Sequence, residues 1–212
     1  MAQIACLHTA DSNVAVFEAA RAKLGWPEDV LSHHVRADLL AATEAAGALT
    51  DEISDQTRQA VAALKRDYPA VLMTCSTLGP ALPTHAPFIL RADGALADAA
   101  VRDGGKVVVI CAAPTTLQST GDLFRAAAAK TGALIDIWWI DGAWDMFKAG
   151  QIDRYEQTLA AAADQARGSG AQQVALAQAS MAGASRRTRL HPLPLTVPES
   201  GLAAAGQIVG LT

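Results

Sequence analysis

The chain has 212 residues, of which 51% are hydrophobic and 18% are charged, and its formal net charge is −4. We expect a globular protein with a sizeable core, and the mild acidity gives no reason to expect a nucleic-acid partner. No apolar stretch approaches the length of a transmembrane helix, and no signal peptide precedes the first strand-like segment, so no membrane partner is expected either.

Short apolar runs rich in β-branched residues alternate along the chain with longer, alanine-rich amphipathic stretches. The short runs predict strands at residues 3–8, 31–35, 70–74, 88–90, 106–111, 134–140, 173–177 and 195–197. The amphipathic stretches predict helices at residues 12–23, 37–45, 51–67, 94–102, 116–131, 153–167 and 201–207. This alternation predicts an α/β fold with mainly parallel sheets covered by helices on both faces.

Several predicted helix ends carry residues suited to capping. Thr50 precedes Asp51 and Glu52, which predicts an N-cap followed by an acidic first turn. Gly104 and Gly132 follow apolar-periodic stretches, where glycine commonly ends a helix. These residues therefore predict where three of the helices begin or end.

The sequence also contains an internal repeat. When the chain is shifted by about 103 residues, residues 4–8 fall on 107–111 and residues 71–77 fall on 174–180. After about four inserted residues, residues 87–90 match 194–197. The repeat predicts two similar α/β lobes, residues 1–94 with 193–212 and residues 95–192, related by a pseudo-twofold axis. We expect a ligand cleft between the lobes, because ligands bind at the carboxyl ends of parallel strands.

The cysteines and histidines limit the kinds of site that are expected. Cys6, Cys75 and Cys111 form no C-x-x-C motif and no disulfide framework, which is typical of a reducing cytoplasm. Cys6 and Cys111 lie in apolar runs and are interpreted as core residues. The histidines have no metal-ligand spacing, and the adjacent His33 and His34 would point to opposite faces of a strand. No metal site is therefore expected.

The most informative strand end is Thr74-Cys75-Ser76-Thr77, which closes the third predicted strand. It places a thiol among hydroxyl groups, as carbanion-forming or acyl-transfer chemistry on a small carboxylate requires. The alternative interpretation is that Cys75 is a small hydrophobic residue of the core.

The first predicted strand ends in another polar turn. His8 can serve there as an acid or a base. Asp11, Ser12 and Asn13 follow it, and any of the three can cap the next helix.

Two further polar turns follow strands in the second predicted lobe. Pro114 opens one of them, and its hydroxyl residues Thr115, Thr116 and Ser119, with backbone N–H groups, are suited to holding a carboxylate. Gln178 and Ser180 form the other turn. Their amide and hydroxyl groups can bind a carboxylate or orient a water molecule, but they cannot take a proton from carbon.

These turns resemble those of the aspartate/glutamate racemase superfamily, which also includes hydantoin racemases, maleate isomerases and arylmalonate decarboxylases. The resemblance rests on the turn at residues 74–77, on Thr116 and Ser119, and on the Pro-Glu-Ser-Gly turn at residues 198–201. It covers nearly the whole chain. It implies a two-lobed fold and cofactor-independent chemistry, in which one cysteine thiolate removes the α-proton and a second thiol delivers a proton to the opposite face.

The sequence departs from this pattern at three positions. Cys75 matches the first cysteine of the family, but Gln178 stands where the second is expected. His8 stands where many members have aspartate, and Ala113 where a threonine commonly helps to bind the substrate carboxylate. A racemisation that uses two cysteines therefore cannot run on this chain.

Three chemistries remain open for a single cysteine. Cys75 can work with His8 in a racemisation or epimerisation, add to an activated double bond as a nucleophile, or deliver a proton to a carbanion left by decarboxylation. We therefore predict a cofactor-independent, racemase-like isomerase for a small carboxylate. The alternatives are a lyase of the arylmalonate decarboxylase type and a carboxylate-binding protein without catalysis.

The expected site follows from these interpretations. The catalytic residues would be Cys75 and His8, and the substrate-binding residues Thr74, Ser76, Thr77, Thr115, Thr116, Ser119, Gln178 and Ser180. The expected partner is a small-molecule carboxylate. The resemblance also implies a homodimer or a higher homo-oligomer.

Overall fold

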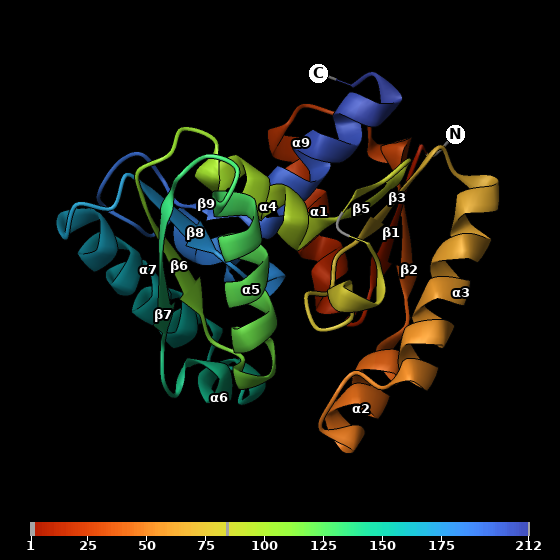
Figure 1. The fold of residues 1–212 in the computed structure, drawn as a ribbon, viewed down its shortest axis with the longest axis horizontal. Coiled ribbons are helices and arrows are strands. Elements are labelled where there is room, and N and C mark those ends of the chain that lie inside the picture. Colours follow the sequence, from red (N-terminus) through yellow and green to blue (C-terminus); the bar gives the residue numbers. More distant parts are fainter. Residues whose placement is uncertain (1–2, 84, 212) are drawn as a thin grey trace. The chain divides into compact units, whose positions relative to one another are not determined.

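The computed structural model describes residues 3–83 and 85–211. It divides the chain into two compact units (Figure 1). The first unit combines Met1–Ala95 with Pro198–Thr212, and the second comprises Leu96–Val197.

The first unit is built on a sheet with the strand order β2-β1-β3-β5-β4. The pairs from β2 to β5 are parallel, and β4 runs antiparallel to β5. The strands are β1 (Ile4–His8), β2 (Leu31–Val35), β3 (Ala70–Met73), β4 (His85–Ala86) and β5 (Ile89–Arg91). The helices are α1 (Ser12–Lys23), α2 (Ala37–Ala46), α3 (Asp51–Asp67) and α9 (Val197–Val209), with α4 (Ala92–Val101) crossing the boundary between the units.

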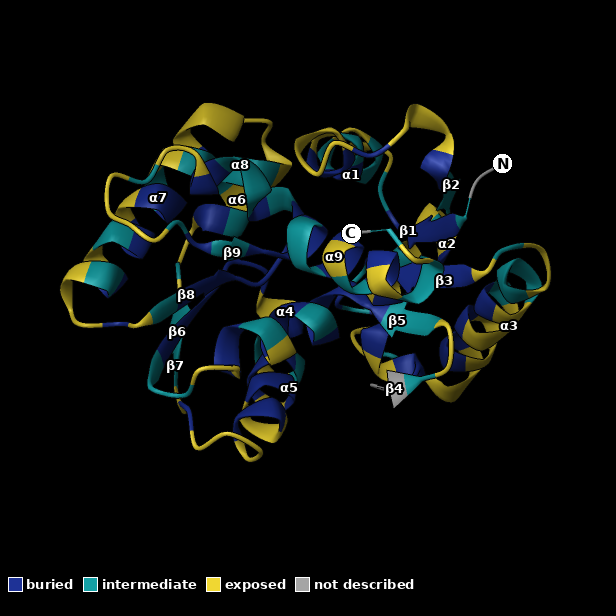
Figure 2. Ribbon diagram, turned by 90° about the horizontal axis from the view of Figure 1, so that it is seen from above, coloured by how far each residue is buried: buried dark blue, intermediate teal, exposed yellow. Residues whose placement is uncertain are grey.

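Helices cover both faces of this first sheet. Ala5 and Leu7 of β1 pack with Leu39 of α2 and Val61 of α3 in one buried cluster. His8 contacts Phe17 of α1, which lies on the other face. In Figure 2, α3 carries buried and exposed residues on opposite sides, as an amphipathic helix on a sheet should.

The second unit repeats this arrangement with the strand order β7-β6-β8-β9, and all of its strand pairs are parallel. The strands are β6 (Lys106–Cys111), β7 (Leu134–Trp139), β8 (Gln173–Leu176) and β9 (Leu195–Thr196). The helices are α5 (Leu117–Ala128), α6 (Ala143–Lys148), α7 (Ile152–Gly168) and α8 (Ala182–Ser185). One buried cluster joins Ile110 and Val174 of the sheet to Tyr155 and Leu159 of α7.

The structure confirms the predicted α/β fold class with mainly parallel sheets. Each strand and helix expected from the sequence is present, with bounds that differ by a few residues. The internal repeat is confirmed as well, because β2-β1-β3-β5 and β7-β6-β8-β9 have the same order. Equivalent hydrogen bonds follow the repeat: Thr74 N donates to Leu7 O at 3.1 Å, and Ala177 N donates to Ile110 O at 3.0 Å.

The sequence did not predict β4, α6 or α8. These elements contain two, six and four residues, so they are too short to show a hydrophobic period. No helix within the described residues has the length and apolar character needed to cross a bilayer.

The expected N-cap of α3 is confirmed, whereas the expected glycine cap of α5 is wrong. Thr50 caps α3, because its side chain accepts a hydrogen bond from Ile53 N at 3.3 Å. Helix α5 ends at Ala128 with Ala129 as its C-cap. Gly104 and Gly132 lie in the turns that follow α4 and α5, where φ values of +70° and +76° fall in the left-handed region that favours glycine.

The expected side-chain cap on α1 is wrong. Asp11 already has helical angles, φ −61° and ψ −32°, so its side chain makes no cap bond in the described structure. Ser12 and Asn13 lie within the helix. The first backbone N–H groups instead donate to backbone carbonyls, from Asn13 N to Ala10 O and from Val14 N to Asp11 O.

Candidate functional site

Cys75 lies in the turn that follows β3 in the first unit. The residue is half-buried and packs against the cluster formed by β1, α2 and α3. The Thr9 hydroxyl and the backbone N–H groups of Thr77 and Leu78 donate hydrogen bonds toward its sulfur. Burial nevertheless raises the pKa of Cys75 above its ordinary value, and the Asp93 carboxylate adds to this effect. The group is therefore a thiol at neutral pH, with donors already placed to stabilise a thiolate.

The neighbouring hydroxyl residues have different environments. Thr74 is buried, and its hydroxyl donates to Leu7 O at 3.0 Å, which ties the turn to β1. Ser76 is also buried, and Thr77 is half-buried and contributes its backbone N–H to Cys75. Thr74, expected to bind substrate, therefore has its hydroxyl proton committed to the protein backbone.

His8 does not have the environment expected of an acid or base that reaches a ligand. Its side chain is fully buried, and both ring nitrogens have protein partners. Nδ1 lies 2.7 Å from Thr74 Oγ1, and Nε2 lies 2.8 Å from His33 Nδ1. Burial, assisted by the neighbouring His33 and His34, lowers the pKa of His8 to about 3. In this structure His8 is a neutral, internally bonded group rather than the expected partner of Cys75 in proton transfer.

Sequence reasoning missed two features beside Cys75. One is Thr9, whose hydroxyl contacts the sulfur. The other is a buried ion pair in which Arg91 Nε and Nη2 donate to Asp93 Oδ1 and Oδ2 at 3.1 and 2.8 Å. The Arg91 guanidinium packs against Gly79, where a Cβ atom would come within 2.8 Å of Nη2. A charged pair directly after an apolar strand was the signal in the sequence that could have revealed this feature.

In the second unit, Gln178 occupies the position that corresponds to Cys75 in the repeat. Its side chain is buried, and Oε1 accepts hydrogen bonds from Ala112 N at 2.8 Å and Ala113 N at 2.9 Å. The amide thus joins the turn after β8 to the turn after β6. Those two backbone N–H groups, which directly precede Pro114 in the expected carboxylate-binding turn, are therefore already hydrogen-bonded to Gln178.

Most of the other expected carboxylate-binding residues of this unit already form hydrogen bonds with residues of the same unit. The hydroxyl of Thr116 donates to Ala113 O at 3.0 Å, and that of Ser119 donates to Thr116 O at 3.1 Å. Ser180 Oγ lies 2.9 Å from the hydroxyl of Tyr155. Thr115 is exposed. Thr116 and Ser119 therefore stabilise the start of α5, while Thr115 lies at the surface.

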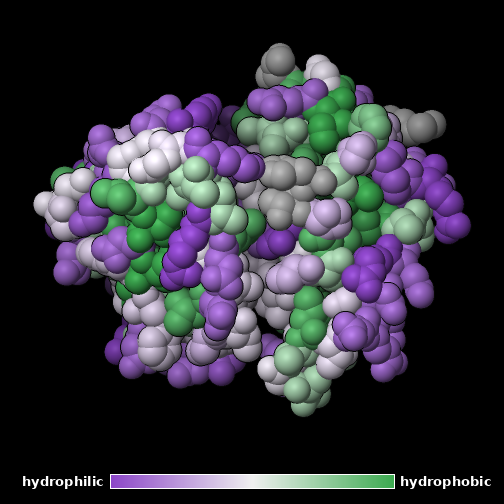
Figure 3. Space-filling view, viewed as in Figure 1, coloured by the Kyte–Doolittle hydropathy of each residue, from purple (hydrophilic) through white to green (hydrophobic). Residues whose placement is uncertain are grey.

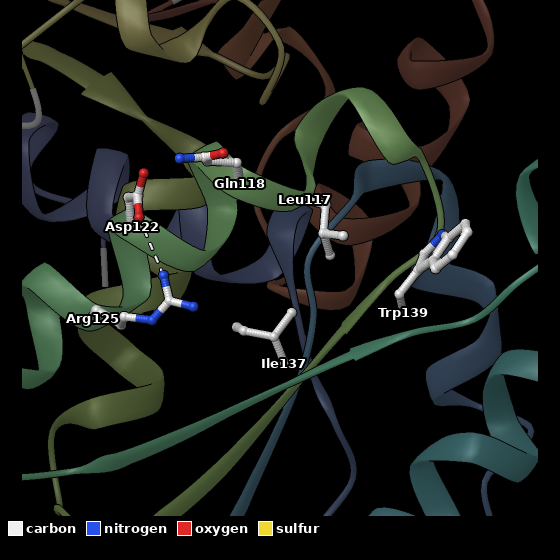
Figure 4. Close-up of a pocket in the computed structure, with 6 residues that line it drawn as sticks. All are labelled: Leu117, Gln118, Asp122, Arg125, Ile137 and Trp139. Carbon is white, nitrogen blue, oxygen red and sulfur yellow. Dashed lines mark hydrogen bonds and ion pairs between the residues drawn. The ribbon is translucent and has the colours of Figure 1, made fainter.

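A cavity of about 470 Å³ lies in the second unit between α5 and β7 (Figure 4). Arg125 and Asp122 form an ion pair at 3.1 Å on one side of it, and Trp139 stands on the other side, with Nε1 donating to Ala112 O at 3.2 Å. In Figure 3 the second unit shows hydrophobic residues beside strongly hydrophilic ones. The remaining lining residues are Leu117, Gln118 and Ile137. None of the expected site residues lines this cavity.

One group of potential metal ligands occurs within the described residues. It consists of Cys6, His8 and His33 in the first unit, whose ligand atoms lie within 4.8 Å of one another. This group could not be recognised from the sequence, because the three residues come from two different strands. His33 and His34 do point to opposite faces, as expected, since His34 Nε2 contacts Ser32 Oγ at 3.0 Å.

No protein-family model and no curated protein matches the sequence. Solved structures do match the fold. The aspartate racemase of Picrophilus torridus is 14% identical with a TM-score of 0.75, covering 98% of this chain and 94% of that one. The glutamate racemase of Thermus thermophilus is 15% identical with a TM-score of 0.64, covering 99% and 82%. The allantoin racemase of Pseudomonas fluorescens is 14% identical with a TM-score of 0.65, covering 99% and 92%. The fold predicted from the resemblance to the aspartate/glutamate racemase superfamily is thus confirmed: this chain has the racemase fold.

Proposed function

We propose that this protein is a cofactor-independent, racemase-like isomerase that acts on a small carboxylate through Cys75. The observation that carries the proposal is the sulfur of Cys75, half-buried at the end of β3 with donors from Thr9, Thr77 and Leu78 directed toward it. A residue with only a packing role has no need of three such donors. The fold shared with aspartate, glutamate and allantoin racemases supports the reaction class.

The proposed reaction is proton exchange at the carbon next to the carboxylate. The thiolate of Cys75 takes the proton from this carbon, and the electron pair left behind is delocalised into the carboxylate. The thiol then returns a proton to the carbon. The donors around the sulfur stabilise the thiolate that begins the cycle, so they offset part of the effect of burial on the pKa.

The resemblance places Gln178 where the racemase superfamily has its second cysteine, and this replacement restricts how the exchange can invert a stereocentre. An amide neither gives nor takes a proton under ordinary conditions, and its oxygen is held by Ala112 N and Ala113 N. Cys75 alone exchanges the proton on one face of the carbon. We therefore propose that proton exchange is faster than inversion of configuration.

A lyase activity is the second candidate, and the state of Cys75 favours it. Because burial raises the pKa of this residue, the thiol form predominates at neutral pH. A thiol is the form that delivers a proton to a carbanion after carbon dioxide has left a malonate. The same residue would then act as a proton donor alone.

The test is deuterium incorporation in heavy water, followed by NMR, with aspartate, glutamate, hydantoins and aryl- or alkylmalonates as substrates. The expected result is exchange or decarboxylation with at least one of these compounds, slowed at least about 100-fold in Cys75→Ser. Cys111→Ser is the matched control, because Cys111 is a buried thiol in β6, and it should retain the activity.

The proposal fails if none of these compounds is exchanged, isomerised or decarboxylated, while at least one of them raises the melting temperature. That result would instead identify a carboxylate-binding protein without catalysis.

A further inference from the structure

The face of the first sheet next to α1 carries a polar cluster that the proposed reaction does not use. Cys6 and His8 lie two residues apart on β1 and so project from the same face. His33 lies on β2 as the direct register partner of Cys6. The cysteine sulfur and the ring nitrogens lie within 4.8 Å of one another, and Cys6 and His8 are fully buried.

The hydrogen bonds on the outer side of both imidazole rings fix their orientation. The Thr74 hydroxyl gives its proton to Leu7 O, so Thr74 Oγ1 accepts from His8 Nδ1 at 2.7 Å. The Glu18 carboxylate accepts from His33 Nε2 at 2.9 Å. These two contacts leave the lone pairs of His8 Nε2 and His33 Nδ1 facing each other at 2.8 Å. Two lone pairs at this distance repel unless a proton or a metal ion lies between them.

The second unit shows that the fold does not require this cluster. The strand positions that correspond to Cys6, His8 and His33 hold Val109, Cys111 and Ile137, with Val109 and Ile137 again in register. Val109 and Cys111 are fully buried. Burying imidazole rings is less favourable than burying apolar side chains of similar size. The histidines of the first unit therefore point to a bound ligand rather than to packing.

We propose that Cys6, His8 and His33 bind one transition-metal ion of the Zn²⁺ type. A sulfur and two imidazole nitrogens are the donor set that this ion prefers. Binding would form bonds from the metal to Cys6 Sγ, His8 Nε2 and His33 Nδ1 and release the thiol proton, together with any proton shared by the two rings, to solvent. Tetrahedral geometry requires the two nitrogens to separate from 2.8 Å to about 3.3 Å.

The surroundings of the cluster agree with a metal site in two respects. Thr74 and Glu18 accept from the outer ring nitrogens, as the outer contacts of metal-bound histidines do. A fourth ligand and the ion itself can approach from the side of His33 and Glu18, whose side chains are 16% and 33% exposed. The site does not include Cys75, so it is independent of the proposed reaction.

The test is a titration of the chelator-treated, full-length protein with Co²⁺ and then Zn²⁺, followed by absorption spectroscopy. One equivalent of Co²⁺ should produce a thiolate-to-cobalt charge-transfer band in the near ultraviolet, which Zn²⁺ should abolish. Cys6→Ser should remove this band. His33→Gln should weaken binding at least about 100-fold, and Glu18→Gln about tenfold.

The chain provides a control for each of the two kinds of ligand, histidine and cysteine. His34→Gln changes the adjacent histidine, which points to the opposite face of β2, and Cys111→Ser changes another fully buried thiol, at the β6 position that corresponds to His8. Both controls, and Cys75→Ser, should bind Co²⁺ as the wild type does. If the wild type takes up no stoichiometric Co²⁺, or if the band survives in both Cys6→Ser and His33→Gln, the proposal is wrong. In that case, a shared proton alone joins the two rings.

Discussion

The two units share a strand order but differ at the strand ends where their chemistry would be expected. In the first unit Cys75 lies two residues after the end of β3, and its sulfur contacts the Thr9 hydroxyl. In the second unit the corresponding residue is Gln178, which contacts Ala112, the counterpart of Thr9. The same contact between two turns is thus a thiol–hydroxyl pair in one unit and an amide–backbone link in the other. The contact of Gln178 stabilises the second unit, whereas the contact of Cys75 is the one that the proposed proton transfer uses.

The largest expected effect concerns the buried ion pair beside Cys75. Arg91→Met should lower the free energy of unfolding by about 3–5 kcal/mol, because it leaves the Asp93 carboxylate buried without its cation. Denaturant titration measures this change. Arg91→Met/Asp93→Asn should recover part of the loss, since the charge is then removed as well.

The control for this prediction is Arg125→Met in the second unit. Arg125 pairs with Asp122, but both side chains are more than half exposed, so the loss should stay below about 1 kcal/mol. Equal effects of Arg91→Met and Arg125→Met would contradict the assignment of the first pair to the core.

Gln178→Ala tests the contact between the two turns of the second unit. It should lower the free energy of unfolding by about 2–4 kcal/mol, because Ala112 N and Ala113 N lose their acceptor inside the protein. Gln118→Ala changes an exposed glutamine of the same unit and should alter stability by less than about 0.5 kcal/mol. If Gln178→Ala also proved neutral, the amide would not be the link between the two turns.

Thr9→Val should have the smallest effect, and on reactivity rather than stability. Removing the hydroxyl takes one donor from the Cys75 sulfur and should raise the pKa of this thiol further. The rate of alkylation by iodoacetamide at neutral pH should fall about threefold. Thr115→Val, an exposed threonine of the second unit, should leave the rate unchanged.

Much of the fold could be predicted because its signals are local. Apolar periodicity located the strands and longer helices, and Thr50 marked the start of α3. The repeat indicated that the sequence should fold into two similar halves, and the common strand order agrees. Even Cys75 could be singled out, because a lone thiol among hydroxyl residues is visible in the sequence.

The contacts of the site could not be predicted, because they depend on register and side-chain direction. The sequence does not show that His33 is the register partner of Cys6, or that His8 turns toward it and away from the surface. It also does not show that Gln178 accepts from Ala112 and Ala113. Hydrogen bonds between residues far apart in the sequence decided which polar residues remain available for a ligand.

The central claim is that Cys75 is the reactive thiol of the molecule, and alkylation of the native protein, mapped by mass spectrometry, tests it most directly. Cys6 and Cys111 are fully buried, so Cys75 should be labelled at least about tenfold faster than either. The rate at Cys75 should rise with pH, with a midpoint above the ordinary pKa of a cysteine, because only the thiolate reacts and burial delays its formation. Equally slow labelling of all three cysteines at every pH would show that Cys75 is a core residue and would contradict the proposed function.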